Sequence, residues 1–246
     1  MMNKNLIRLA VFFSLLLTIA CGKKDYFQDT GTHAGSFNGT ALQYLESKPE
    51  YFDSLVKVIK LAGMEQQLSA NNITFFAPAD SSIRSAIRKA NELLDRIGKP
   101  RITKLTDIAP GVWKKHLSKY LFKFSKSLND FSQIDFSNIN TYSGQMYESV
   151  SGISMNIGAV YLDIQLPRKD NPNEYNVIKY AGARILTISY LTSPFTPRDV
   201  GTWRTANISS VNIKPTNGYV HLIRIVGHDF GFSDTEFSND VAYFNN

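Results

Sequence analysis

The spacing of apolar residues along this chain changes near Phe122. Before that position, apolar side chains recur every three or four residues, as at Phe52, Leu55 and Ile59, which is typical of an amphipathic helix. After it, short segments rich in β-branched and aromatic residues are separated by Gly, Asn and Pro, which is typical of strands. Helices followed by strands predict an α+β fold, and the lack of an internal repeat of fixed period favours one domain.

Several residues mark where the predicted helices begin and end. Thr40 is expected to cap a short helix, Pro49 to occupy the first turn of the next helix, and Gly63 to follow its last turn. Asp80 is expected to cap the helix that follows it, and the pair Asn217-Gly218 favours a turn with a positive φ. The later helices are predicted at residues 81–97 and 111–121.

The predicted strands are short and most of them lie in the second half of the chain. A first buried strand at residues 73–77 is stopped by Pro78. The remaining strands are predicted at residues 131–136, 152–157, 160–166, 175–180, 184–190, 206–213 and 219–226. The acidic and aromatic residues 233–246 are expected to form a poorly ordered C-terminal tail.

The N-terminus has the pattern of an export signal. Lys4 and Arg8 precede an apolar run, residues 9–20, that ends in Ala20-Cys21. The run is shorter than the roughly 18 residues that a membrane-spanning helix needs, so a permanent transmembrane anchor is not expected. Cys21 is the only cysteine in the chain, so an intrachain disulfide is impossible.

The segment Leu17-Thr-Ile-Ala-Cys21 resembles the lipobox of bacterial lipoproteins, in which the cysteine is lipidated and becomes the mature N-terminus. This resemblance implies a signal peptide at residues 1–20, a lipid anchor such as palmitate on Cys21, and a flexible tether at residues 21–35. It also implies a location at the cell outer membrane. Exposure at the cell surface is expected, with a periplasmic orientation as the alternative.

Composition narrows the class of protein and of partner. The chain carries a formal net charge of +6, and 43% of its residues are hydrophobic, which is typical of a packed globular protein. Removing residues 1–20 removes Lys4 and Arg8 and no acid, leaving 25 basic and 21 acidic residues. Because the signal directs the chain out of the cytoplasm, nucleic acid is not an expected partner.

The basic residues are concentrated in one region. Twelve basic and three acidic residues lie between Arg84 and Lys126. Lys115 and Lys119 share a helical face opposite Trp113, so both lysines are expected to face solvent. This region is either an ordinary solvated surface or a patch for acidic glycans or lipid phosphates. The candidate residues of the patch are Arg84, Arg88, Lys89, Lys114, Lys115 and Lys119.

No pattern in the sequence indicates catalysis or a bound metal. The four histidines, His33, His116, His221 and His228, lack the spacing of metal ligands, and no catalytic motif is present. We therefore expect a non-enzymatic protein without a cofactor. His221 lies inside a predicted strand and is expected to make a buried hydrogen bond. The acids at positions 229, 234, 236 and 240 lack the spacing of a calcium loop and are expected to be solvated.

Three segments together resemble the fasciclin (FAS1) domain family. They are Tyr51-Phe-Asp-Ser-Leu-Val-Lys-Val-Ile-Lys-Leu-Ala-Gly-Met, Thr74-Phe-Phe-Ala-Pro-Ala-Asp-Ser-Ser-Ile and Asn217-Gly-Tyr-Val-His-Leu-Ile. The resemblance covers residues 36–232, with extra residues around 91–112 and 138–205. The continuation Gly227-His-Asp-Phe-Gly-Phe is similar to the ending of fasciclin-type lipoproteins of Bacteroidetes.

This resemblance implies a single expanded domain in which N-terminal helices pack on a β-sheet wedge or sandwich. It also implies a surface-anchored adhesion or ligand-binding module for extracellular protein or glycan. The alternative is an accessory subunit that docks on the transporter components of an outer-membrane nutrient-uptake complex. In the family's middle motif a histidine follows a tyrosine, whereas this chain has Tyr120-Leu121. An adhesion role for that motif is therefore not carried over.

Overall fold

The computed structural model describes residues 35–171, 173–191 and 199–245. The predicted signal peptide, Cys21 and nearly all of the predicted tether lie outside these residues. The helices are α2 (Ala41–Glu46), α3 (Pro49–Leu61), α4 (Glu65–Ser69), α5 (Asp80–Arg96), α6 (Pro110–Leu117) and α7 (Asp234–Tyr243). Short 3-10 turns lie at Leu105–Asp107, Ser118–Tyr120, Leu128–Asp130 and Val200–Thr202. No helix in the described part of the chain is long and apolar enough to cross a membrane.

The described strands form one nine-stranded sheet and one separate hairpin. The strands are β1 (Ser36–Phe37), β2 (Ile73–Ala77), β3 (Leu121–Phe122), β4 (Gln133–Ile134), β5 (Gln145–Glu148), β6 (Ser154–Tyr161), β7 (Ile164–Pro167), β8 (Tyr175–Ile178), β9 (Arg184–Leu191), β10 (Trp203–Pro215) and β11 (Gly218–Ile223). The sheet runs in the order β3-β2-β11-β10-β9-β6-β4, with β1 on β10 and β5 on β6. The last strand, β11, therefore lies in the middle, parallel to β2.

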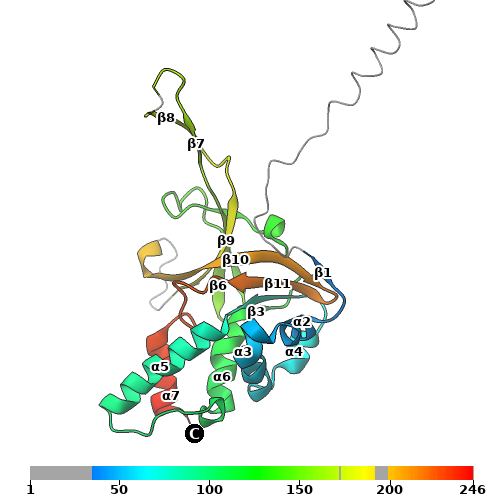
Figure 1. Ribbon diagram of the computed structural model, residues 1–246, viewed down its shortest axis with the longest axis vertical. Helices are drawn as coiled ribbons and strands as arrows, with labels where there is room; N and C mark the ends of the chain where they lie inside the picture. The colour runs from blue at the N-terminus through cyan, green and yellow to red at the C-terminus, as the bar shows by residue number, and fades with distance from the viewer. Residues whose placement is uncertain (1–34, 172, 192–198, 246) are drawn as a thin grey trace, which may run out of the picture. The chain divides into compact units, whose positions relative to one another are not determined.

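The α+β fold predicted from the sequence is confirmed. Figure 1 shows the helices gathered on one side of the sheet, with the β7–β8 hairpin projecting away from them. The main core lies between the helices and the sheet and includes Leu55, Phe75, Ile83 and Trp113, all fully buried. Burial of such large apolar side chains is the main stabilising contribution in a chain without disulfides.

Local signals placed the first helices correctly. The Thr40 hydroxyl accepts a hydrogen bond from the Gln43 amide at 3.3 Å, and the Gln43 side chain accepts one from the Thr40 amide at 2.8 Å, which is a capping box. α3 starts at Pro49, and Gly63 follows it with a φ of +62°, a conformation that glycine adopts without strain. These caps involve only neighbouring residues, so the sequence pattern is sufficient to predict them.

Asp80 caps a different helix from the one predicted. The Asp80 carboxylate does not cap α5; it accepts hydrogen bonds from the amides of Ser54 at 2.8 Å and Leu55 at 2.9 Å in α3. Those amides are free because Phe52 has non-helical dihedral angles and breaks α3 after its first turn. Asp80 thus caps the second part of a neighbouring helix.

The Asn217-Gly218 pair also differs in part from its prediction. Gly218 does not have a positive φ; instead, a Cβ there would overlap the Ile73 carbonyl of the adjacent strand β2. The Asn217 amide group donates to the carbonyls of Leu68 and Ala70 and accepts from the Ala41 amide at 2.8 Å. Asn217 lies in the turn between β10 and β11, as predicted, but its side chain also joins this turn to the helical layer, and Gly218 is the first residue of β11.

The strand break predicted between residues 157 and 160 does not occur. β6 continues through Gly158, where a Cβ would overlap the side chain of Ile134 in the neighbouring strand. The chain instead leaves the sheet after Tyr161 and forms the β7–β8 hairpin. The predicted C-terminal tail is also wrong, because residues 234–243 form α7, with Phe237 and Val241 buried against the core.

Candidate functional site

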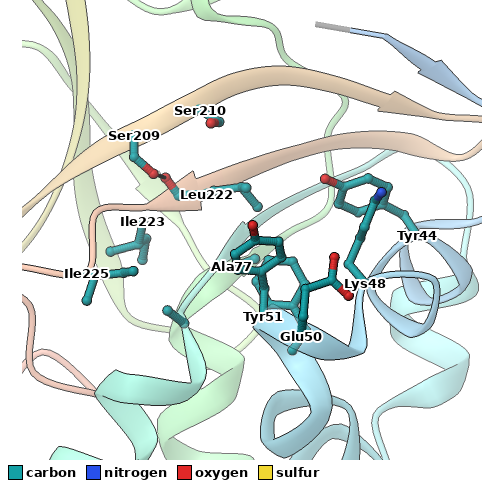
Figure 2. Close-up of a pocket in the computed structure, with 12 residues that line it drawn as sticks. Tyr44, Lys48, Glu50, Tyr51, Ala77, Ser209, Ser210, Leu222, Ile223 and Ile225 are labelled. Atoms are coloured by element: carbon teal, nitrogen blue, oxygen red, sulfur yellow. Dashed lines mark hydrogen bonds between the residues drawn. The ribbon is translucent and has the colours of Figure 1, made fainter. Parts of the chain in front are cut away.

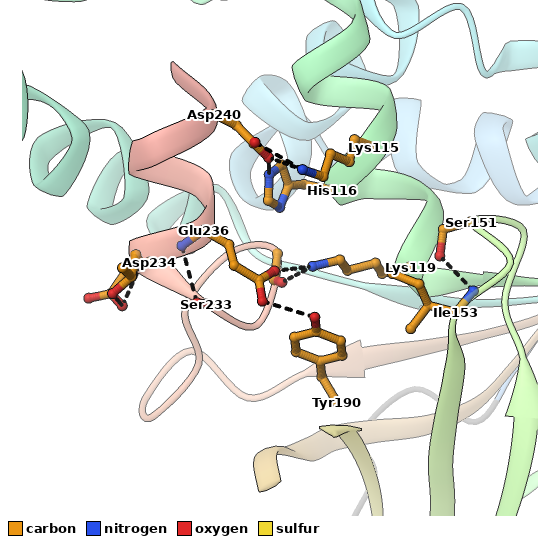
Figure 3. Close-up of polar contacts among 12 residues, drawn as sticks. Lys115, His116, Lys119, Ser151, Ile153, Tyr190, Ser233, Asp234, Glu236 and Asp240 are labelled. Atoms are coloured by element: carbon orange, nitrogen blue, oxygen red, sulfur yellow. Dashed lines mark hydrogen bonds and ion pairs between the residues drawn. The ribbon is translucent and has the colours of Figure 1, made fainter. Parts of the chain in front are cut away.

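Two regions of the structure bear on function, and the first contains half of the basic residues predicted as a patch. We call residues 227–243, which include α7, the C-terminal clasp. Figure 3 shows acidic side chains of the clasp meeting lysines of the helical layer. The Lys89 ammonium lies 2.6 Å from Asp229 and 2.9 Å from Asp234, and the Lys115 ammonium lies 2.7 Å from Asp240.

Lys119 is the most deeply enclosed of these lysines. Its side chain is 1% exposed, and its ammonium donates to Glu236 at 2.9 Å and to the Gly231 carbonyl at 3.0 Å. The same ammonium lies 4.3 Å from the centre of the Tyr190 ring, whose hydroxyl donates to the second Glu236 oxygen. The expectation that Lys119 faces solvent was wrong, because α6 ends at Leu117 and a 3-10 turn rotates Lys119 under the clasp.

Burial also controls the histidines beneath the clasp. His116 Nε2 lies 2.7 Å from the Asp240 carboxylate, and burial lowers the pKa of His116 while Asp240 partly opposes that shift. The Tyr120 hydroxyl shares a hydrogen bond of 2.8 Å with His228 Nε2 and accepts one from the Gly231 amide. The histidine partner of Tyr120 therefore comes from the clasp rather than from the next residue. Burial lowers the pKa of His228 to about 4.

The clasp is a permanent part of the fold. Phe230, Phe232 and Phe237 are all buried, and they pack on Trp113 and Tyr120 with ring centres 4.8–5.8 Å apart. Exposing one buried Phe costs about 3–5 kcal/mol by the measure of truncation to Ala. Releasing three would therefore consume most of the roughly 5–15 kcal/mol that holds a domain folded. The clasp cannot act as a displaceable lid over the lysines.

The six predicted patch residues therefore differ in whether they have an ion-pair partner and in where that partner lies. Lys89, Lys115 and Lys119 pair with the clasp, and Arg88 pairs with Glu92 on its own helix at 2.9 Å. Arg84 and Lys114 are exposed and have no ion-pair partner among the described residues. The acids at positions 229, 234, 236 and 240, expected as a solvated tail, are the counterions of these lysines.

The second region is a groove that no pattern in the sequence predicted. It has a volume of about 390 Å³ and lies between the α2–α3 helices and strands β10 and β11 (Figure 2). We call it the α3–β11 groove. Its lining residues are Tyr44, Lys48, Glu50, Tyr51, Phe52, Ala77, Ala79, Ser209, Ser210, Leu222, Ile223 and Ile225. This volume is within the range of roughly 300–1,000 Å³ that is typical of small-molecule sites.

Two irregularities in the backbone shape this groove. The break of α3 at Phe52, held by Asp80, separates Glu50 and Tyr51 in the first turn from the rest of the helix. The pairing of β10 with β11 shifts register on both sides of Ser210. Such bulges redirect side chains and are common beside functional sites. The two walls of the groove are therefore set by the helix break and by the bulged strand.

The groove contains polar groups that the fold itself does not use. The side chains of Lys48, Glu50 and Tyr51 and the hydroxyls of Tyr44 and Ser210 have no hydrogen-bond or ion-pair partner within residues 35–171, 173–191 and 199–245. Burial raises the pKa of Tyr44, with a smaller contribution from the Glu50 carboxylate. Its phenol therefore stays protonated and can donate. Figure 2 shows Tyr44, Lys48, Glu50 and Tyr51 on the helical side, opposite Ile223 and Ile225.

The described histidines, His116, His221 and His228, are buried and make structural contacts. Within the described residues, no group of three His, Cys, Asp or Glu side chains could hold a metal ion. His221 makes the buried contacts predicted for it: its Nε2 donates to the Lys126 carbonyl at 3.0 Å, and its Nδ1 accepts from the Asn212 amide at 3.3 Å. The groove offers hydrogen-bonding groups and an aromatic surface, which are suited to binding.

The comparisons with known proteins give a similarity in structure and none in sequence. No protein-family model matches the chain, and no curated protein sequence matches it. A solved FAS1 domain pair from the insect cell adhesion molecule fasciclin I is similar, with a TM-score of 0.32 and 13% sequence identity. The similarity covers 76% of this chain and 45% of that chain, so this protein spans less than half the length of the solved chain. At this TM-score the similarity assigns no activity, and the FAS1 resemblance rests on the sequence motifs.

The sequence offered only a weak signal for the groove. Glu50 and Tyr51 follow Pro49 in the first turn of the helix predicted there, and Tyr51 precedes the apolar positions of that helix and falls outside its buried stripe. Single exposed aromatic residues are common on protein surfaces, so Tyr51 alone is a weak sign of a binding surface. The serines of β10 carry no such sign, because their role depends on the bulge.

Proposed function

We propose that this protein is a non-enzymatic adhesion or ligand-binding module that binds extracellular protein or glycan through the α3–β11 groove. The observation that carries the proposal is the set of polar groups in the groove that have no partner in the described fold. Polar groups lining a groove without an internal partner are available to a ligand, and two backbone irregularities hold them in place. This role agrees with the adhesion function implied by the FAS1 motifs.

A direct test compares groove variants with matched surface variants. The double variant Lys48→Gln, Glu50→Gln removes both groove charges, and Lys123→Gln, Glu148→Gln removes two exposed charges elsewhere. We expect the purified protein to capture ligands from arrays of extracellular proteins and glycans. The groove variant should lose those ligands and the matched variant should keep them. Equal capture by both variants would place the binding face outside the groove.

The proposed location is the outer membrane, with the domain outside the cell and Cys21 carrying the lipid. The support is the segment Leu17–Cys21 and the basic and apolar residues before it. Metabolic labelling with an alkyne analogue of palmitate should mark the wild-type protein and not Cys21→Ser. Protease added to intact cells should digest the domain; full protection would instead place it in the periplasm.

A second candidate function is the accessory subunit of an outer-membrane uptake complex, and the β7–β8 hairpin favours it. Leu166, Tyr175, Val177 and Ile178 are each about half exposed on this two-stranded hairpin, which belongs to no larger described sheet. An isolated hairpin is marginally stable in water, and apolar side chains gathered on it are typical of a contact surface.

A photo-crosslinker at Val177 tests the second candidate in native membranes. Crosslinks to a transporter subunit, absent when the crosslinker is placed at Glu148, would support the accessory role. Crosslinks only to another copy of this chain, or none at all, would contradict it.

A further inference from the structure

We infer that the α3–β11 groove binds a neutral sugar ring or disaccharide, with the Tyr51 ring against the sugar face and Glu50, Lys48 and Tyr44 at its hydroxyls. The inference rests on the proposed function, because it names the ligand class of the same groove. It also replaces the acidic glycan considered from the sequence by an uncharged one. Four features of the groove support it.

The first feature is an exposed aromatic ring beside an apolar wall. Tyr51 is 59% exposed in the first turn of α3, and Ile225, on the other side of the groove, is also 59% exposed. A pyranose ring has C–H groups on its faces and hydroxyls around its edge. The negative face of an aromatic ring attracts such C–H groups. Tyr51 can therefore cover one sugar face while Ile225 contacts the apolar remainder.

The second feature is the mixture of donors and acceptors. The Glu50 carboxylate has two acceptor oxygens that can receive two neighbouring hydroxyls, whereas the Lys48 ammonium only donates. The Tyr44 and Ser210 hydroxyls both donate and accept. Because every sugar hydroxyl also donates and accepts, this combination can satisfy a polyol edge.

The third feature is the balance of charge. Lys48 and Glu50 are the charged residues that line the groove, and they contribute one charge of each sign. An anionic ligand would gain from Lys48 and lose a similar amount at Glu50, so the site offers no net attraction for it. A neutral ligand uses both residues as hydrogen-bonding groups.

The fourth feature disfavours a peptide that adds to the sheet. Such a peptide needs a strand with a free edge. At the groove, β11 has no free edge, because it lies between β2 and β10. The groove residues Ser209 and Ser210 lie in the part of β10 that pairs with β11, beyond its pairing with β9 at Trp203–Asn207. The volume of about 390 Å³ is also near the lower end of small-molecule sites, which suits one or two sugar rings better than a longer chain.

The experiment measures binding of defined probes to the purified chain by saturation-transfer NMR and calorimetry. The neutral probes are maltotriose, cellotriose, xylotriose and mannotriose; the other probes are trigalacturonate and a mixed pentapeptide library. We expect at least one neutral sugar to bind. Tyr51→Ala and Glu50→Gln should each lower the affinity for that sugar at least about tenfold, as expected for losing one stacking or charge-assisted contact. Tyr51→Phe keeps the ring and should retain most of the affinity.

Tyr175→Ala and Glu148→Gln are matched controls, because they remove an exposed Tyr and an exposed Glu outside the groove, and they should leave affinity unchanged. Binding of trigalacturonate or peptides in the groove, without neutral sugars, would overturn this inference and leave the proposed function standing. Sugar binding that Tyr51→Ala and Glu50→Gln do not weaken would overturn the inference as well. If the double variant Lys48→Gln, Glu50→Gln still bound the array ligands of the wild type, that result would contradict the proposed function itself.

Discussion

The C-terminal clasp and the α3–β11 groove use polar residues in opposite ways. In the clasp, Lys89, Lys115 and Lys119 each have a carboxylate within 2.9 Å, supplied by residues more than 100 positions away in the chain. In the groove, Lys48 and Glu50 face the same space without an internal partner among the described residues. The dense cluster of basic residues in the sequence therefore belongs to a structural region. The candidate site instead contains two charged residues, Lys48 and Glu50, that no pattern in the sequence singled out.

The difference shows why charge counts alone are a poor guide to binding. A charge that is already paired and partly buried contributes little to the free energy of ligand binding, because the ligand would first have to replace an existing partner. A charge on a groove wall with only water around it can be desolvated and paired by the ligand. The comparison predicts that clasp variants change stability and that groove variants change binding.

The largest effect is expected from the aromatic base of the clasp. Phe237→Ala removes a fully buried ring and should lower the free energy of unfolding by about 3–5 kcal/mol, measured by urea denaturation. Phe244→Ala, at a position 69% exposed, should change it by less than about 0.5 kcal/mol. If the folded Phe237→Ala variant also lost ligand binding in the groove, the two regions would not be independent.

The next largest effect is a loss of folding stability at acidic pH, which depends on His228 in the clasp. Burial lowers the pKa of His228 from 6.5 to about 4, so below pH 6.5 the unfolded chain binds a proton that the folded chain does not. Stability is thus present above pH 6.5 and is lost as the pH falls toward 4, by roughly 3 kcal/mol for this residue.

His228→Gln keeps an acceptor for the Tyr120 hydroxyl and removes the titration. Its free energy of unfolding should fall less steeply between pH 6.5 and 4 than that of the wild type. His221, whose pKa burial also lowers to about 4, remains in both proteins as an internal reference. An unchanged pH slope in the variant would show that His228 is not the titrating group.

A smaller effect is expected at the enclosed ion pair. Lys119→Met fills the same space but removes the Lys119 ammonium as donor to the Gly231 carbonyl and to one Glu236 oxygen, while Tyr190 still donates to the other. The cost should be about 1–3 kcal/mol, because Glu236 is partly exposed and water can replace one partner. Lys114→Met, exposed on α6, is the control and should be near neutral. Equal melting temperatures for the two variants would contradict the structural role of Lys119.

The smallest effect on stability is expected where the fold supports the groove. Asp80→Ala removes the acceptor of the Ser54 and Leu55 amides and should cost about 1–2 kcal/mol, as loss of a helix cap does. Because the first turn of α3 carries Glu50 and Tyr51, this variant should also weaken groove binding. Asp53→Ala, an exposed acid on the same helix, should change neither property measurably.

The parts of the fold that were predictable depend on neighbouring residues. The Thr40 cap and the glycine after α3 involve contacts within four positions, and the amphipathic pattern of α5 gave its limits to within one residue. The buried hydrogen bonds of His221 followed from its position in an apolar strand. None of these needed knowledge of which distant elements meet.

The candidate site was not predictable in the same way. The sequence predicts that Asp80 caps its own helix, because the break of α3 at Phe52 cannot be inferred from the pattern. It predicts that Lys119 faces solvent, because the 3-10 turn after α6 cannot be inferred either. The groove depends on both the break and the bulge at Ser210. Each is a feature of packing between segments far apart in the sequence.

By itself, the sequence determined the α+β class and the main helix limits, because periodicity and caps act over a few residues. Only the tertiary structure decided which charges are free. An ammonium such as Lys119 has the same chemistry in any sequence, and its availability to a ligand depends on whether folding brings a carboxylate to 2.9 Å from it or leaves only water beside it.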